Sequence, residues 1–205
     1  SRGDQESAVE RELVMSGIGG QGVQLASSVL ATAAFAEGLE VQLFGSYGGM
    51  MRGGATEAAV VFGTDAIEAP PTMSSAWSVI LLHHEHSAHA RACVRPGGIV
   101  MVNTSVVDVP VDTPGVTVVD VPATDIASEV GHPMAASLVM AGAYVAATSL
   151  VSLEALTAAV AATLPPYRAQ HRELNERALA AGADAVGRDL VPAWPSEAPA
   201  SGARA

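Results

Sequence analysis

Two glycine-rich stretches contain the residue types that could bind an anion. The first, Gly17-Ile18-Gly19-Gly20-Gln21-Gly22, has glycines at 17, 19 and 22, which fits G-x-G-x-x-G at a turn between a strand and a helix. Glycine permits a tight bend and brings a ligand close to bare backbone. The first amides of the following helix point outward at the positive end of its dipole, which suits a phosphate or carboxylate. The same spacing also suits a turn that only packs a helix against a sheet.

The second stretch, Gly45 to Gly54, has five glycines in ten positions. It is predicted to be a loop, because glycine weakens the interiors of helices and strands alike. The loop contains Tyr47-Gly48 and then Arg52-Gly53-Gly54. Arg52 has a forked guanidinium, which such a loop can bring together with several amides onto one anion. An arginine that ties down its own loop or a neighbouring subunit is the alternative.

The two stretches are predicted to lie along one rim of a sheet. They follow the first and second strands, and loops at the C-terminal ends of parallel strands gather on the same edge, where ligands bind. A dinucleotide would further need an acidic residue at the end of the second strand. That strand is predicted over Val41–Phe44, and Glu40 lies at its beginning, which argues against NAD or FAD.

A histidine-rich stretch at 83–89 suggests a metal site but does not fit a known pattern. The zinc-protease motif H-E-x-x-H would pair His84-Glu85 with a histidine at 88, where Ala88 stands. His86 and His89 could share one helix face, but zinc needs three or four ligands. No cysteine and no further histidine cluster supplies them, and His132 and His171 are far away in sequence. Polar residues at the open end of a buried strand are the simpler interpretation, and no metal ligand is predicted.

No catalytic residue is predicted either. Ser46 and Ser105 lack a recognisable nucleophile elbow, and Cys93 lies in a predicted helix interior, where cysteine usually acts as a small apolar filler. Cys93 is the single cysteine of the chain, so it cannot form an internal disulfide and cannot alone hold an iron–sulfur cluster. A reducing, cytoplasmic location is consistent with this cysteine content.

The overall charge excludes other classes of partner. The 205 residues include 10 arginines, no lysine and 21 acidic residues, which give a formal net charge of −11. So acidic a chain is a poor partner for nucleic acid or for an anionic membrane. The stretch Pro133–Leu153 has no charged residue, but it is rich in small residues that gain little in lipid, so a buried helix is predicted there. Gly142 and Ala146 would let another backbone approach that helix.

The remaining pattern is an alternation of strands and helices, which indicates an α/β fold with a mostly parallel sheet and helices on both faces. Residues 1–10 are predicted to be a loose tail, 11–182 a single domain, and 183–205 a disordered tail. Strands are predicted over 12–16, 41–44, 55–62, 78–82, 99–103 and 116–121, and helices over 23–37, from the histidines to 94, after 122, from 133, over 153–164 and over 168–181.

At this point the residues resemble a family. Gly17-x-Gly19-Gly20-Gln21-Gly22-Val23 followed by Tyr47-Gly48-x-x-x-Arg52-Gly53-Gly54 resembles the gamma subunit of 2-oxoacid:ferredoxin oxidoreductases. Later pieces agree, and the resemblance covers about residues 11–182. The later motifs that agree are Ile67-x-x-Pro70, Pro96-Gly97-Gly98 before a strand that ends in Asn103, and Asn175-x-x-Ala178-x-x-x-Gly182. One departure is Ser137, where the family often has asparagine in the long helix.

The resemblance implies a subunit that is not active alone. In such enzymes thiamine diphosphate and the iron–sulfur clusters belong to other parts of the complex, and this chain would hold no cofactor by itself. Its partners would be alpha and beta subunits and, through the complex, ferredoxin. The reaction is oxidative decarboxylation of a 2-oxoacid, usually onto coenzyme A. The loop from Tyr47 to Gly54 is most similar to the 2-oxoglutarate type, with the indolepyruvate and pyruvate types as alternatives.

Two alternatives from other classes are a free-standing nucleotide-binding regulator and a partner subunit whose glycine loops only pack. Under the ligand hypothesis, the cofactor-binding positions are those of the two glycine motifs. They are Gly17, Gly19, Gly20, Gln21, Gly22, Tyr47, Gly48, Arg52, Gly53 and Gly54.

Overall fold

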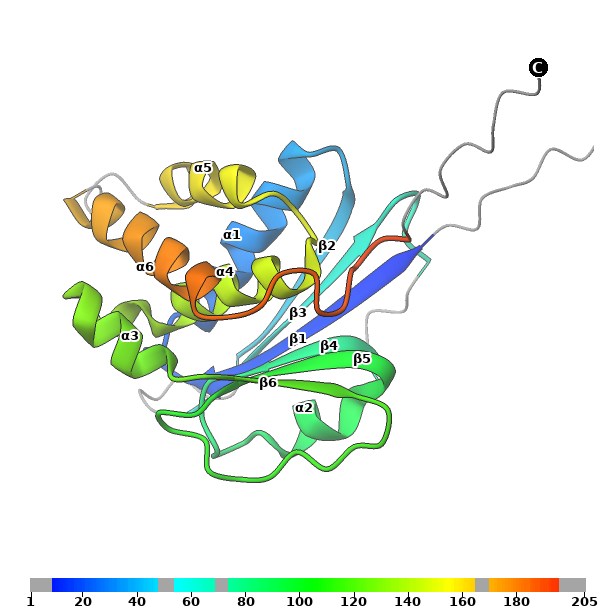
Figure 1. The fold of residues 1–205 in the computed structure, drawn as a ribbon. Helices are drawn as coiled ribbons and strands as arrows, with labels where there is room; N and C mark the ends of the chain where they lie inside the picture. Colours follow the sequence, from blue (N-terminus) through cyan, green and yellow to red (C-terminus); the bar gives the residue numbers. More distant parts are fainter. Residues whose placement is uncertain (1–8, 48–53, 69–73, 165–169, 196–205) are drawn as a thin grey trace, which may run out of the picture.

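A single sheet of six strands organises the chain. The computed structural model describes residues 9–47, 54–68, 74–164 and 170–195 (Figure 1). Across the sheet the strands follow the order β2-β3-β1-β4-β5-β6. Their bounds are β1 Glu10–Ile18, β2 Glu40–Tyr47, β3 Ala55–Gly63, β4 Ala76–Leu81, β5 Val94–Asn103 and β6 Thr117–Val121.

The sheet is mixed, with one reversed strand. β1, β4, β5 and β6 pair in parallel, whereas β3 is antiparallel to both β1 and β2. The other five strands therefore point the same way, and the prediction of a mostly parallel α/β sheet is confirmed. Because β2 and β3 form an antiparallel pair, the connection between them emerges at the same edge as the turn after β1.

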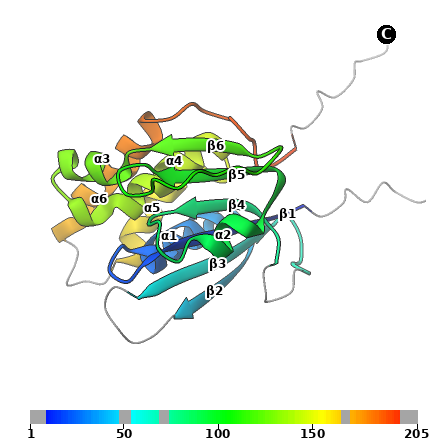
Figure 2. The same cartoon turned by 90° about the horizontal axis from the view of Figure 1, so that it is seen from below.

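Helices cover both faces of the sheet, but unequally (Figures 1 and 2). Alternate residues of a strand point to opposite faces. Leu13, Met15 and Ile80 accordingly belong to the large core under most of the helices, and Val14 and Val79 belong to a small core under α2. The helices are α1 Val23–Ala36, α2 Ala88–Cys93, α3 Ala123–Val130, the 3-10 helix η1 Pro133–Ala135, α4 Ala136–Thr148, α5 Leu153–Thr163 and α6 Arg172–Asp184.

The central helix α4 lies directly against α6. A Cβ added to Gly142 would lie 2.0 Å from the carbonyl oxygen of Leu179, and one added to Gly182 would lie 1.9 Å from that of Val139. The prediction that Gly142 admits a neighbouring backbone is therefore confirmed, and the neighbour belongs to this chain. In the part of the chain that the structure describes, no helix is long and apolar enough to cross a membrane.

Several element boundaries differ from the sequence prediction, and two of these differences lie beside the glycine-rich and histidine-rich stretches. β2 continues through Tyr47, so the loop predicted from Gly45 is wrong for its first three residues. Their pairing with β3, as far as Tyr47 opposite Thr56, supplies the hydrogen bonds that override the weak strand preference of glycine. The helix predicted to follow the histidines is confined to Ala88–Cys93, and β5 starts immediately afterwards at Val94.

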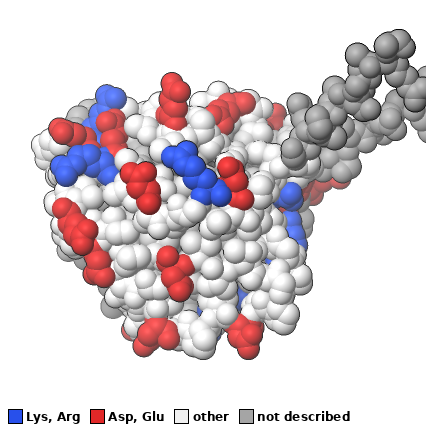
Figure 3. Space-filling view, viewed as in Figure 1, with Lys and Arg blue, Asp and Glu red and all other residues white. Residues whose placement is uncertain are grey.

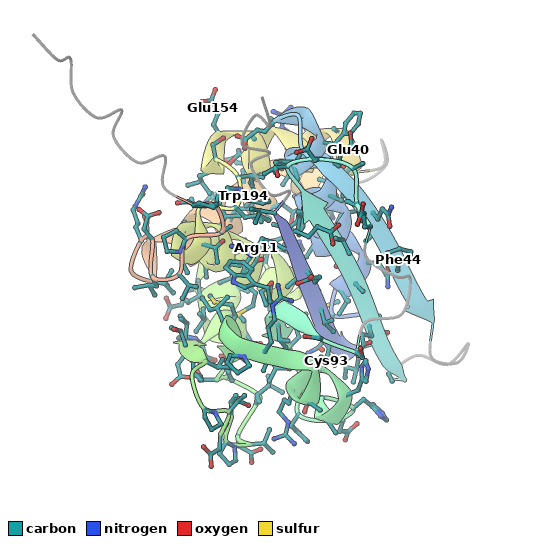
Figure 4. The ribbon with its side chains drawn as sticks, turned by 90° about the vertical axis from the view of Figure 1, so that its right-hand side faces the viewer. Arg11, Glu40, Phe44, Cys93, Glu154 and Trp194 are labelled. Atoms are coloured by element: carbon teal, nitrogen blue, oxygen red, sulfur yellow. The ribbon has the colours of Figure 1, made fainter. Side chains whose placement is uncertain are left out.

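The segment after α6 is a second correction. Residues 183–205 were predicted to be disordered, yet residues up to 195 pack onto the domain. The amides of Asp189, Val191 and Ala193 donate to carbonyls at the end of α4, and Ala193 is fully buried. Arg11 donates to the carbonyl of Ala193, and Arg11 and Trp194 lie close together in Figure 4. The last carbonyls of α4 have no partner within the helix, and they order a segment that composition alone assigns to a tail.

Candidate functional site

The glycine turn joins β1 to α1 through two left-handed residues. Gly20 has a φ of 98° and Gly22 a φ of 80°, values that residues with a side chain rarely adopt. Gly22 is the N-cap of α1, and no side chain caps that helix. The turn therefore leaves the first amides of a 14-residue helix without a capping side chain, as the anion hypothesis requires.

Gln21 fixes this turn from within. Its Oε1 accepts from the amide of Ile18 at 2.9 Å, and its Nε2 donates to the carbonyl of Leu82, just beyond β4, at 3.2 Å. A Cβ at Gly17 would come within 2.7 Å of the same Oε1. Gly17 and Gln21 thus act on the protein's own backbone and on the neighbouring strand, and they hold the shape of the turn.

The two glycine stretches meet in the fold. The amide of Gly19 donates to the carbonyl of Gly54 at 2.8 Å, which ties the turn to the beginning of β3. The Gly19 amide is therefore used within the protein, where it joins the two loops. Tyr47 ends β2, but Gly48, Arg52 and Gly53 lie outside the described residues.

The carboxylate considered for a dinucleotide lies at the far edge of the sheet. β2 begins at Glu40 and runs parallel to β1, so Glu40 and the glycine turn are at opposite ends of the strands (Figure 4). The structure therefore separates Glu40 from the glycine turn.

Asn103 is a structural centre of this edge. It is fully buried at the end of β5, and its Nδ2 donates to the carbonyl of Leu82, the same oxygen that Gln21 contacts. Its Oδ1 accepts from the amides of Ala123 and Thr124 and so caps the start of α3. In the sequence, this role was indicated only by a polar residue, Asn103, at the end of an apolar strand. The result is one hydrogen-bonded network under three loops.

A cavity of about 330 Å³ opens beside the turn. It is lined by Gly20 and Gly22 and by two histidines that sequence analysis did not single out, His132 and His171, whose rings stack with centroids 5.3 Å apart and planes 6° apart. Burial and then His171 lower the pKa of His132, while the Asn175 side chain acts in the opposite direction. The two histidines are far apart in sequence, so only the fold reveals the pair.

The histidine-rich stretch lies near the small core and not at this cavity. His89 Nδ1 lies 3.1 Å from Glu57 Oε2, and Cys93 Sγ lies 3.4 Å from His89 Nε2. Burial, and then Glu57, raise the pKa of the Cys93 thiol. Within the described residues, no group of three or more histidine, cysteine or acidic side chains could hold a metal ion.

Charge is spread thinly over the surface. On the face in Figure 3, acidic side chains are scattered over the helices, with few basic ones among them. With 10 arginines and no lysine in the whole chain, an anion would depend mainly on backbone amides, on histidines and on the few arginines.

The sequence and the fold of this chain both match a known class of protein. A match to the family described as pyruvate ferredoxin/flavodoxin oxidoreductase covers residues 12–185. The chain belongs to this family, and the resemblance found in the sequence is confirmed.

Individual relatives agree. The chain is 32% identical over 160 residues to 2-oxoglutarate synthase subunit KorC of Methanocaldococcus jannaschii, covering 77% of this chain and 85% of that protein. It is 34% identical over 161 residues to the common gamma subunit of the pyruvate/ketoisovalerate oxidoreductases of Thermococcus kodakarensis, covering 74% and 85%. The crystal structure of a keto/oxoacid ferredoxin oxidoreductase gamma subunit from Geobacter sulfurreducens superposes with a TM-score of 0.70 at 28% identity, covering 85% of this chain and 96% of that one.

Proposed function

We propose that this chain is the gamma-type subunit of a 2-oxoacid:ferredoxin oxidoreductase and that the 2-oxoacid is 2-oxoglutarate. The family match over residues 12–185 carries the proposal. The preference for 2-oxoglutarate rests on the KorC relative, whereas the Thermococcus kodakarensis relative serves pyruvate and ketoisovalerate enzymes. The reaction would be oxidative decarboxylation to the acyl-coenzyme A in the cytoplasm, with alpha and beta subunits as partners and ferredoxin as acceptor.

The cofactors of such an enzyme divide into those that this chain fits and those that it does not. A chain with one cysteine cannot hold an iron–sulfur cluster alone, and its described residues contain no ligand group of three. We therefore assign the clusters, and thiamine diphosphate, to the partner subunits. Coenzyme A, which supplies the thiol that accepts the acyl group, fits better, because the uncapped start of α1 favours a phosphate.

We propose that the rim formed by the two glycine motifs faces the catalytic subunits and seats coenzyme A. The link from Gly19 to Gly54 supports this proposal, because it fixes one end of the Arg52 loop at the start of α1. The remaining amides of the turn would then act with the Arg52 guanidinium on one anionic group. The engaged amides of Gly19 and of Gln21, which donates to the carbonyl of Ile18, favour the competing function, a turn that only packs, at those two positions.

Reconstitution tests this function. The chain should co-purify with the alpha and beta subunits of its own source, and the complex should reduce ferredoxin with 2-oxoglutarate and coenzyme A. Pyruvate, ketoisovalerate and indolepyruvate are the matched substrates that decide the type. A lone chain that decarboxylated a 2-oxoacid after addition of thiamine diphosphate would contradict the subunit assignment.

A further inference from the structure

The cavity beside the glycine turn has the composition of a ligand site. One part of the lining is the turn that leads into α1, with Gly20 and Gly22, and another is the start of η1 and of α6, with His132, His171 and Asn175. The rest of the lining is apolar, and it consists of Leu25, Met134, Ala135, Leu138 and Leu164. A concave apolar site with a few polar groups at one end suits a small organic molecule with one polar head.

The polar groups of this cavity favour a negative charge. The positive end of the α1 dipole and the two imidazoles meet around one space. Burial and His171 lower the pKa of His132 and so oppose its protonation. An anion between the histidines and the helix would remove that opposition, because an opposite charge nearby stabilises the imidazolium.

A buried hydroxyl gives an independent indication. Ser137 is 1% exposed, and its Oγ has no hydrogen-bond partner in the structure. The same atom would lie 2.6 Å from a Cβ added to Gly22, so it points at the N-cap of α1. Buried polar atoms are nearly always paired. Ser137 lies behind Gly22 and is not itself part of the cavity lining, so a group bound at the start of α1 would offer its hydroxyl a partner.

Among the residues that the structure describes, the helices α1 and α4 bring no acidic or basic side chain to this cavity. Neither α1 nor α4 contains an Asp, Glu, Arg or His. The charged residues nearest in sequence to the two histidines are exposed, and they are Asp125 and Glu129 on α3 and Arg172 and Glu173 on α6. Of the described residues that line the cavity, the two histidines are therefore the ionisable ones.

We propose that this cavity binds a small phosphate monoester, with the phosphate at the start of α1 and a proton taken up by the His132–His171 pair. The apolar wall holds the organic part of the molecule. This site shares the start of α1 with the proposed coenzyme A rim, but it goes beyond that function because it adds the cavity and the two histidines, does not involve Arg52 and does not require the partner subunits. Its ligand is either a free phosphate ester or a phosphate-bearing end of coenzyme A, which competition distinguishes.

Calorimetry on the full chain without partners tests the site, with phenyl phosphate as the probe. Saturable binding is expected, with proton uptake seen as a dependence of the heat on the buffer. Phenyl sulfate, whose own charge is constant, should bind more tightly at about pH 6 than at about pH 8, because imidazole titrates in that interval. Displacement of phenyl phosphate by coenzyme A would show that the two share the site, and lack of displacement would show that the ligand is a separate ester.

Variants separate this site from adventitious binding. His132→Gln and His171→Gln should each weaken phenyl phosphate binding by about tenfold or more, the scale of a hydrogen bond to a charged group. They should also abolish the pH dependence for phenyl sulfate. Ser137→Ala, which removes one oxygen and preserves packing, should weaken binding severalfold. His84→Gln, in the histidine-rich stretch, which does not line the cavity, is the control and should change nothing. Absence of saturable binding at millimolar probe, or equal binding by folded His132→Gln, would overturn the proposal.

Discussion

At the crossing of α4 and α6, each helix presents a glycine to the backbone of the other, whereas at the turn before α1 the glycines are needed for their backbone angle. Gly142 and Gly182 are helical and would clash with carbonyl oxygens if they carried a Cβ. Gly20 and Gly22 have positive φ, and a Cβ at Gly20 would meet nothing within 4 Å. At the crossing, glycine lets two helix backbones come into contact. At the turn, glycine permits left-handed backbone angles. We therefore expect substitutions at the crossing to change the free energy of unfolding. Substitutions on the rim formed by the two glycine motifs should mainly change the binding of coenzyme A.

The largest effect is expected at the crossing. Gly142→Ala should lower the free energy of unfolding by about 3 kcal/mol, the upper end of the overpacking range, because the clashing atom is backbone that cannot rotate away. An uncrowded helical position would instead gain about 1 kcal/mol from the same change, so the sign is decisive. Chemical denaturation of the lone chain measures it. A stabilised variant would show that the helices are not this close.

A comparable effect, on catalysis instead of stability, is expected at the rim. In the reconstituted complex, Arg52→Ala should lower kcat/KM for coenzyme A by about 1.5 to 3 kcal/mol, the scale of a hydrogen bond to a charged group. Arg52→Lys should recover part of the loss, because it restores a charge but not the fork. Unchanged kinetics for coenzyme A and the 2-oxoacid in an intact complex would leave only a packing role for the loop.

A smaller stability effect separates backbone angle from crowding at the turn. Gly22→Ala should cost about 2 kcal/mol and Gly38→Ala about 1 kcal/mol, since both force a side chain into left-handed backbone but only Gly22 also meets Ser137. In a Ser137→Ala background the cost of Gly22→Ala should fall toward that of Gly38→Ala. Thermal melts of the wild type, Gly22→Ala, Ser137→Ala and the double variant give this double-mutant cycle, and Gly38→Ala is the reference outside it. Equal costs in both backgrounds would mean that Ser137 does not crowd the turn.

The smallest effect concerns pH. The folded-state pKa of His132 is lowered, so the unfolded chain binds its proton more readily. The stabilisation from neutral His132 should be complete above the unfolded pKa of about 6.5 and should decline as the pH falls through that value. His132→Gln should therefore flatten the Tm-versus-pH curve on the acid side, with His84→Gln as the control. A curve of unchanged slope would remove His132 as its source.

The sequence predicted what depends on local pattern and missed what depends on distant pairing. The glycine turn, the α/β alternation and the close approach at Gly142 all follow from spacing within one element or its neighbour. The insertion of β3 between β2 and β1 could not be read from Ala55–Phe62, because strand direction depends on the partner strand. The His132–His171 pair arises because α3 and α6 pack together, which no local spacing encodes.

The hydrogen bond from Arg11 to the carbonyl of Ala193 has a consequence for how this domain can be combined with others. It places the entrance of the chain into β1 and its exit after α6 side by side at one corner of the sheet (Figure 1). A domain whose two ends meet can be spliced into a longer polypeptide, or circularly permuted with a short linker, and the entropic cost of closing that linker is small. The fold is thus suited to serve either as a separate subunit or as a cassette within a larger chain.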